Sequence, residues 1–396
     1  MSVDASTNVI ESSLAKLRRH LEMDVAFVGR VEAGRRYFEF VDTDSPDCPV
    51  QVGQSDALED SYCGRVISGQ IPKLIADATR EPGVSDLPVT RDLPVGAHIS
   101  VPLLRASGEV MGTLCCFSHE PDLTLRERDL KMLTLFAEIV SANLEAMIDD
   151  DQRREVAIER VRGVLEAGGP RMALQPIVDL KSEEVRGFEA LARFGGDSGW
   201  NPQQWFEEAT AVGLGVELEA AAVREALALL PVMPEGALLT VNVSEAAIRD
   251  PGVLAMLTGP HAPRLVVELT EHNRVRDYGV MSDELAAIRG AGGRLAVDDA
   301  GSGWAGLEHI LRLQPEVLKL DRVLVHGIAE HEGRQAMVEA MVGFSARMGA
   351  TLVAEGVETE ADLAMLCELG VHCAQGYLLG RPSLAYADRS SPRRIA

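Results

Sequence analysis

The chain has 396 residues, of which 46% are hydrophobic, and its formal net charge is −23. This length allows two domains with hydrophobic cores, and the acidic balance argues against binding to a nucleic-acid polymer or an anionic membrane. The N-terminus has no signal-peptide pattern, and no apolar run reaches the about 20 residues of a membrane helix. With six cysteines and no CxxC pair, these features predict a cytoplasmic protein.

The first part of the chain predicts an antiparallel sheet flanked by helices. Apolar residues at helical spacing predict an amphipathic helix over 9–22, and strand-like runs follow at 24–31 and 37–41. The next predicted elements are a helix over 61–68, an extended segment at 72–75, a hairpin of strands 98–104 and 110–117, and a long helix from Thr124. This order is typical of an α+β domain.

The apolar pattern of the long helix continues past the end of this domain. It reaches Ile148 and resumes at Val156 after the charged segment 149–155, and no glycine or proline interrupts 122–162. Two structures fit this pattern. One is a continuous connecting helix, which could form a dimeric coiled coil, and the other is two packed helices with a charged linker.

Eight short apolar segments alternate with helix-length stretches from about residue 170. They lie at 172–178, 185–193, 237–244, 264–271, 293–300, 317–321, 351–358 and 372–379. Eight strands alternating with helices over some 200–250 residues are typical of a TIM-type (β/α)8 barrel.

Polar residues gather at the C-terminal ends of these segments. They are Gln175, Glu189, Arg193, Asn242, Glu268, Glu271, Asp298, Asp299, Lys319, Asp321, Glu355, Glu358 and Gln375. The last inward-facing residue of a barrel strand points into the mouth, where barrel enzymes hold their active sites. A single polar strand end can be a helix cap, but that role does not explain a mostly acidic ring.

Converging carboxylates repel one another unless they are protonated or neutralised by cations. Oxygen ligands favour Mg²⁺ or Mn²⁺, with Ca²⁺ as an alternative, and the adjacent Asp298 and Asp299 could serve two ions that clamp a phosphodiester. Lys319 is the cation among these acids. It could orient or deprotonate the attacking water or stabilise charge on the phosphate; a buried lysine paired with Asp321 or another carboxylate is the structural alternative.

The segment FEALARF (188–194) resembles the signature of EAL-domain cyclic-di-GMP phosphodiesterases. The other markers of that family occur in the family's order: LQPIVDL (174–180), VNVS (241–244), ELTE (268–271), DDAGSGWAGL (298–307), LKLDR (318–322), AEGVET (354–359) and QGYLLGRP (375–382). The resemblance implies a modified barrel over 166–396 in which one strand runs against the others. It also implies hydrolysis of cyclic di-GMP to linear pGpG.

The resemblance also assigns roles by position. It implies that the ligands of two Mg²⁺ or Mn²⁺ ions are Glu189, Asn242, Glu268, Asp298, Asp299 and Glu355. It implies that the catalytic group includes Lys319, Glu355, Gln375 beside the reacting water, and Glu271, which holds the loop after the fifth strand. The implied substrate contacts are Gln175, Leu191 and Arg193, with Asp321 and Glu358 as further pocket positions.

One loop departs from the family pattern. DDFGTGYSSL, the usual family sequence, is DDAGSGWAGL here. Ser302 keeps a hydroxyl group for Glu271, but Ala300 removes an apolar anchor of the loop. We expect this change to affect the catalytic rate more than metal binding.

Residues 1–148 resemble a GAF sensory domain, through SYCGRVISGQIP (61–72) and the hairpin GAHISVPL…GEVMGTLCCF. Its ligand is not indicated. Cys63 and His98 could touch a ligand or a haem, although structural roles fit both. The resemblance implies a regulatory domain, joined by a connecting helix over 149–165, and a homodimer formed through the GAF-like domain, this helix and the barrel.

A degenerate barrel that binds cyclic di-GMP without cleaving it is the main alternative. Such receptors usually lose metal ligands, whereas this sequence keeps them all, which favours the enzyme. The ordered motifs disfavour a third possibility, an unrelated metal-dependent barrel enzyme.

Overall fold

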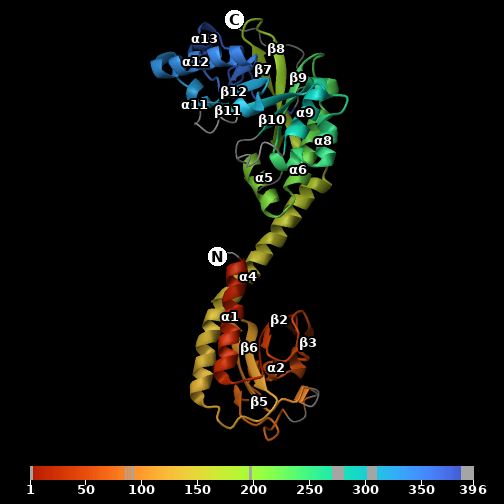
Figure 1. Cartoon of the computed structure of the whole chain (residues 1–396), viewed down its shortest axis with the longest axis vertical. Coiled ribbons are helices and arrows are strands. Elements are labelled where there is room, and N and C mark those ends of the chain that lie inside the picture. The colour runs from red at the N-terminus through yellow and green to blue at the C-terminus, as the bar shows by residue number, and fades with distance from the viewer. Residues whose placement is uncertain are drawn as a thin grey trace. The chain divides into compact units, whose positions relative to one another are not determined.

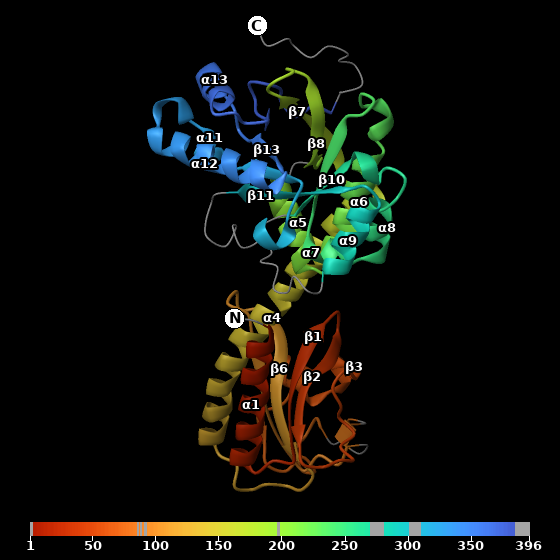
Figure 2. The same ribbon diagram turned by 45° about the horizontal axis from the view of Figure 1, so that its top comes forward.

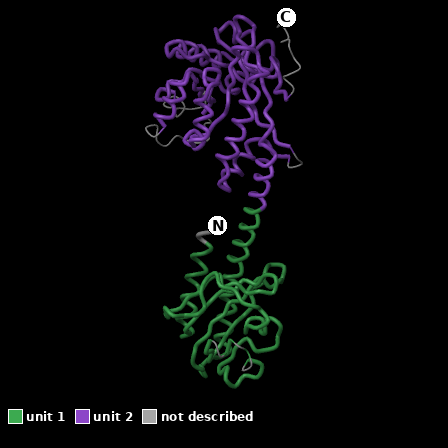
Figure 3. The backbone as a smooth tube through the Cα atoms, turned by 90° about the vertical axis from the view of Figure 1, so that its right-hand side faces the viewer, with its two compact units in different colours: residues 1–155 green, residues 156–396 purple. Residues whose placement is uncertain are grey.

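The computed structural model describes residues 3–84, 87, 89–90, 93–195, 199–269, 281–300 and 310–384, without the side chains of 3–5, 299 and 300. The chain divides into two compact units, residues 1–155 and 156–396, which Figure 3 shows in different colours.

Unit 1 is built on a six-stranded antiparallel sheet with the strand order β3-β2-β1-β6-β5-β4. The strands are β1 (Val25–Glu32), β2 (Arg35–Thr43), β3 (Ser55–Ala57), β4 (Leu74–Ile75), β5 (Ala97–Leu104) and β6 (Val110–Ser118). The sheet confirms the predicted α+β domain. The sequence analysis did not predict β3, since three residues without an apolar alternation carry no strand signal.

The two faces of this sheet are covered differently. Helices α1 (Val3–Leu21) and α4 (Glu127–Glu166) lie side by side on one face (Figure 1), where Leu14 and Leu133 share a buried core with Ile99. The other face packs against the short helix α2 (Tyr62–Ile67), near the 3-10 turn η1 (Leu58–Asp60). Successive side chains of a strand point to opposite faces of the sheet, so His98 and Cys115 point away from α1 and α4 and toward α2.

Helix α4 is one uninterrupted helix of 40 residues, Glu127–Glu166. Of the two structures that fit the sequence of this region, the continuous helix is the one formed. Among the described residues, no helix is both long enough and apolar enough to span a bilayer.

Unit 2 is a closed eight-stranded barrel with the order β10-β11-β12-β13-β14-β7-β8-β9. The strands are β7 (Arg171–Asp179), β8 (Val185–Arg193), β9 (Leu238–Val243), β10 (Leu265–Leu269), β11 (Arg294–Ala300), β12 (Val317–Leu320), β13 (Thr351–Ala354) and β14 (Cys373–Ala374). Strand β7 pairs antiparallel with both β8 and β14, while the other neighbouring pairs are parallel. The modified barrel with one reversed strand is thereby confirmed.

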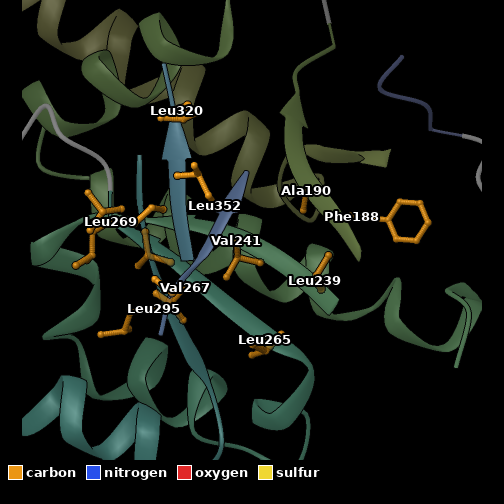
Figure 4. Packing of buried hydrophobic residues seen from close by; sticks show 14 of the residues in the cluster. Phe188, Ala190, Leu239, Val241, Leu265, Val267, Leu269, Leu295, Leu320 and Leu352 are labelled. Atoms are coloured by element: carbon orange, nitrogen blue, oxygen red, sulfur yellow. The ribbon is translucent and has the colours of Figure 1, made fainter. Parts of the chain in front are cut away.

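Helices surround the strands of this barrel, as Figure 2 shows. They are α5 (Pro202–Ala211), α6 (Gly215–Leu227), α7 (Glu245–Ile248), α8 (Pro251–Leu257), α9 (Ser282–Gly290), α11 (Arg322–Val325), α12 (Glu332–Met348) and α13 (Glu360–Glu368), with short 3-10 turns η2 (Leu230–Val232), η3 (Ala262–Arg264) and η4 (Ile328–Glu330). Outward-facing strand residues such as Leu239, Leu295 and Leu320 form the core between strands and helices (Figure 4). Successive strand residues alternate in direction, so Lys319 faces the barrel interior when its neighbours Leu318 and Leu320 face the helices.

Two predicted strands are shorter than their apolar segments suggested. The segments 351–358 and 372–379 contain strands only at Thr351–Ala354 and Cys373–Ala374. Gly356 has a φ of 69°, which extended backbone does not adopt, and ends the first of them. Glu355 and Gln375 therefore lie directly after strands rather than within them.

Candidate active site

Lys319 lies at the centre of the polar residues inside the barrel. Its side chain is 2% exposed, and its Nζ lies 2.5 Å from Glu355 Oε1 and 2.7 Å from Glu268 Oε2. The same nitrogen lies 3.5 Å from Glu189 Oε2 and 3.9 Å from Asp298 Oδ1. One buried ammonium group is thus shared by four carboxylates.

Side-chain amides hold one of these carboxylates from two sides. Asn242 Nδ2 donates to Glu189 Oε1 at 3.0 Å, and Gln375 Nε2 donates to Glu189 Oε2 at 2.6 Å. Gln375 Nε2 also donates to Gln175 Oε1 at 3.0 Å, while Gln175 Nε2 donates to the Gly380 carbonyl at 3.1 Å. Both oxygens of Glu189 are therefore fixed in position.

Strand register brings these residues to one level of the barrel. Gln175 on β7 is the partner of Glu189 on β8, and Asn242 on β9 is the partner of Glu268 on β10. Residues paired across neighbouring strands have neighbouring side chains on the same face. The polar strand ends predicted from the sequence thus converge because the barrel closes.

Backbone bonds position the two residues that follow β13 and β14. The Glu355 amide donates to the Leu320 carbonyl at 3.2 Å, and the Gln375 amide donates to the Ala354 carbonyl at 2.8 Å. Gly376, next to Gln375, lies so close to Val357 that a Cβ there would overlap with the Val357 carbonyl.

Burial and crowding shift the ionisation of the acids. Burial raises the pKa of Glu268 well above its usual value, and the carboxylates nearby add to this effect against the pull of Lys319. Burial also raises the pKa of Glu355 to about 7. For Glu189 burial acts in the same direction, but Lys319 and the hydrogen bonds from Gln375 and Asn242 bring its pKa below the usual value.

For Lys319 the same surroundings favour the charged form. Burial disfavours its charge, but the surrounding carboxylates, led by Glu189 and Glu268, raise the pKa of Lys319 well above the usual value. A single cation for four carboxylates leaves an excess of negative charge in a buried site.

The donor set fits divalent metal ions. Gln375 Oε1 is buried without a hydrogen-bond partner among the described residues. Glu268 Oε2 is likewise buried without a hydrogen bond there, although it lies close to the charge of Lys319. Carboxylate and amide oxygens around excess negative charge are the environment that hard cations prefer.

For four of the predicted substrate residues, no polar contact with this cluster is found among the described residues. Arg193 donates to the Ala192 carbonyl at 2.8 Å, and Leu191 is half-buried on the same strand. Asp321 accepts from the Val323 amide at 2.7 Å and caps α11. Glu358 accepts from Arg322 at 2.9 Å. Within the described part of the chain, no hydrogen bond or ion pair joins these four to Lys319 and its partners.

The structural alternative was a buried lysine paired with Asp321 or another carboxylate, and Lys319 is indeed buried and pairs with Glu268 and Glu355, not with Asp321. Glu271, the side chain of Asp299 and the loop 301–309 with Ser302 lie outside the described residues, as does the side chain of Ala300. The Gly380 carbonyl, which holds Gln175, was not predicted from the sequence. The one feature of the sequence that could have indicated this contact is the glycine of the GRP run (380–382). A Cβ at Gly380 would clash with Pro176, so only glycine lets this backbone approach the strand that carries Gln175.

Comparisons with known proteins agree with this geometry. The family model of the EAL domain matches residues 158–382, and that of the GAF domain matches residues 6–145. A solved structure titled PaMucR phosphodiesterase in complex with c-di-GMP is 28% identical, with a TM-score of 0.52, and covers 58% of this chain and 98% of that chain.

Two curated relatives carry names related to the same dinucleotide. The bifunctional diguanylate cyclase/cyclic di-GMP phosphodiesterase MucR of Pseudomonas aeruginosa is 26% identical over 74% of this chain. The probable cyclic di-GMP phosphodiesterase PdeN of Escherichia coli is 29% identical over 53% of this chain. The alignments span 43% of the length of each relative. With the EAL match extending over more than half of its residues and a GAF match preceding it, this chain belongs to the EAL domain family.

Proposed function

We propose that the chain is a metal-dependent phosphodiesterase that hydrolyses cyclic di-GMP to linear pGpG. The observation that carries this proposal is the buried Lys319 among Glu189, Glu268, Asp298 and Glu355. The named relatives and the c-di-GMP complex of a 28% identical structure support the choice of substrate.

The ions would be two Mg²⁺ or Mn²⁺. Their proposed ligands are Glu189, Asn242, Glu268, Asp298, Asp299 and Glu355. When bound, such ions polarise the phosphate and lower the pKa of an attacking water molecule.

Lys319 supplies a fixed positive charge in this proposal. Its Nζ is held by four carboxylates, which favour the ammonium form over the neutral amine. An ammonium group donates hydrogen bonds and cannot accept a proton. We infer that Lys319 orients the reacting water or stabilises charge on the phosphate oxygens.

Gln375 positions the groups around it. Its Nε2 donates to Glu189 Oε2 and Gln175 Oε1, which leaves the buried Oε1 to accept a hydrogen bond from the reacting water. Among the proposed substrate contacts, the guanidinium of Arg193 suits a phosphate, Leu191 offers an apolar surface, and Asp321 and Glu358 complete the pocket. Glu271 would hold the loop after the fifth strand.

The test is the production of linear dinucleotide by the full chain, measured by chromatography with Mg²⁺ or Mn²⁺ and abolished by a chelator. Glu189→Ala and Lys319→Ala should each lower turnover on the order of a hundredfold or more. The matched controls are Glu332→Ala and Lys181→Ala, which change exposed residues of unit 2. Intact substrate after long incubation with either metal, despite tight binding, would establish the receptor function instead.

We further propose that unit 1 regulates the barrel in a cytoplasmic homodimer, formed through the GAF domain, the connecting helix and the barrel. Leu135 and Ile139 support a dimer, since these two apolar side chains of α4 are 59% and 45% exposed. They lie four residues apart and so share one side of the helix. The cysteines support the proposed cytoplasmic location, because all six are free thiols and disulfides are rare in the cytoplasm.

A further inference from the structure

A second cluster of metal-ligating side chains lies in unit 1. Cys63 is on α2, His98 on β5 and Cys115 on β6. Both cysteines are fully buried, and His98 is 3% exposed. A sulfur of each cysteine and a ring nitrogen of the histidine all lie within 4.8 Å of one another.

The charges around this cluster are already paired. Arg36 Nη1 donates to Cys63 Sγ at 2.9 Å, and Arg36 Nε donates to Asp56 Oδ1 at 3.0 Å. The Arg36–Asp56 pair is neutral as a whole. Two thiolates in this buried place would therefore need a further cation.

Cys63 and Cys115 are in direct contact with each other. Burial opposes ionisation of Cys63, but its contact with Cys115 at 2.8 Å, the charge of Arg36 and the neighbouring His98 bring the pKa of Cys63 well below its usual value. Burial and the neighbouring Cys63 raise the pKa of Cys115. A metal ion that bound both sulfurs would displace any proton that they carry.

The polar neighbour of the buried His98 ring is Cys63, whose pKa it helps to lower. Neither ring nitrogen makes a well-formed hydrogen bond with the described residues. The ring of Tyr62 packs against it at a centroid distance of 4.7 Å, but the Tyr62 hydroxyl is bound to Thr90 instead. A buried imidazole whose nitrogens make no well-formed hydrogen bond is costly, and a metal ion bound together with the adjacent Cys63 would satisfy one of them.

A cavity of about 30 Å³ lies beside His98, which lines it together with Arg36, Tyr62 and Phe117 among others. This volume has room for one water molecule, which needs at least about 10–15 Å³. Three protein ligands and one exchangeable position form a common arrangement for Zn²⁺.

We propose that Cys63, His98 and Cys115 bind one thiophilic divalent cation, Zn²⁺, with a fourth position open toward this cavity. Thiolate and imidazole ligands prefer Zn²⁺, whereas the all-oxygen site in the barrel prefers harder ions. The two sites should therefore select different metals. A disulfide between the same two sulfurs is the competing use of this cluster, but it would leave His98 without a partner.

The test uses Co²⁺ as a spectroscopic probe for Zn²⁺ in the reduced, metal-free full chain. One equivalent of Co²⁺ at the cluster should give a near-ultraviolet thiolate-to-metal charge-transfer band, which the barrel ligands cannot give because they contain no sulfur. Added Zn²⁺ should displace Co²⁺ and so remove the band. Cys63→Ala and Cys115→Ala should abolish it, and His98→Gln should weaken Co²⁺ binding at least tenfold.

Cys116→Ala is the matched control, since Cys116 is also fully buried on β6 but faces the other core. The band should persist in this variant. The spectrum of the unmodified chain is itself decisive, so the proposal stays testable if a variant fails to fold. It is overturned if that chain gives no thiolate band, or if the band survives in both cysteine variants. It is also overturned if two thiols are lost to a disulfide under air and reductant restores them without any metal-binding capacity.

Discussion

Lys319 occupies a position where a charge would ordinarily be unstable. Removing one partner of a buried ion pair typically destabilises a protein by about 3–5 kcal/mol, because the remaining charge is left uncompensated. Here the carboxylates of Glu268 and Glu355 lie within 2.7 Å of the ammonium. The same contacts that make the charge tolerable also fix it at the point where we propose that the phosphate reacts.

Gln375→Leu tests the positioning of Glu189. The substitution removes the Nε2 donor that serves Glu189 and Gln175, while a similar volume is retained. We expect turnover to fall about 10–100-fold, as for other residues that orient ligands. We also expect a loss of about 1–3 kcal/mol in the free energy of unfolding, because a buried acceptor loses its donor.

Steady-state kinetics and denaturant unfolding of the same preparations measure both effects. Gln203→Leu is the control, because this glutamine is exposed on α5. Unchanged turnover in a folded Gln375→Leu protein would contradict the positioning role.

At the level of elements, Asp362 connects the start of α13 to the turn η4. Its side chain is 3% exposed and accepts from the Ala329 amide at 3.2 Å, the Gly327 amide at 3.3 Å and the Thr359 hydroxyl at 2.8 Å. Burial opposes ionisation of Asp362, but these hydrogen bonds, first of all that from Thr359, lower its pKa below the usual value. The ionised carboxylate therefore stabilises the junction.

Asp362→Asn should cost about 1.5–3 kcal/mol of unfolding free energy at pH 7, because hydrogen bonds to a charged acceptor are lost. A carboxylate with a lowered pKa stabilises the fold above the ordinary pKa of aspartate, about 3.9. This contribution disappears as the pH falls through the lower value of the folded state. The difference between variant and wild type should thus shrink in acid.

Denaturant unfolding between pH 7 and pH 3 follows this difference. Asp283→Asn is the control, since Asp283 is an exposed acid in the first turn of α9. A difference that stays constant over the whole pH range would rule out the ionised carboxylate as its source.

At the level of the whole molecule, the proposed homodimer depends on α4. Replacing both Leu135 and Ile139 by glutamate places charges on the exposed apolar side of the helix. We expect the double variant to sediment as a monomer at micromolar concentration, where the unmodified chain sediments as a dimer. Val52→Glu changes another apolar residue, 63% exposed, and should leave the dimer intact. A monomeric unmodified chain would contradict the proposal.

The proposed regulation depends on the continuity of the same helix. An insertion of seven residues after Asp151 changes the helical phase by only about 20°, whereas two residues change it by about 200°. We expect turnover of the seven-residue variant to match that of the unmodified chain, and turnover of the two-residue variant to differ from it. Equal turnover in all three proteins would argue against signal transfer through α4.

The sequence by itself determined the order of the elements and the polar ends of the barrel strands. Apolar alternation and strand-ending residues are local properties, so segments such as 185–193 and 317–321 were found close to their observed bounds. The polar strand ends also identified Glu189, Lys319 and Gln375 as candidate site residues. The order of the motifs along the chain indicated the EAL domain family.

Only the tertiary structure decided which of these residues meet. Lys319 contacts Glu268 rather than Asp321, because Asp321 has left the strand and caps α11. Likewise, Cys63, His98 and Cys115 are far apart in the sequence and share no motif. The register between β5 and β6 and the packing of α2 on the sheet bring them together. Sheet register and barrel closure act over long sequence separations, and the local pattern of residues does not encode the resulting distances.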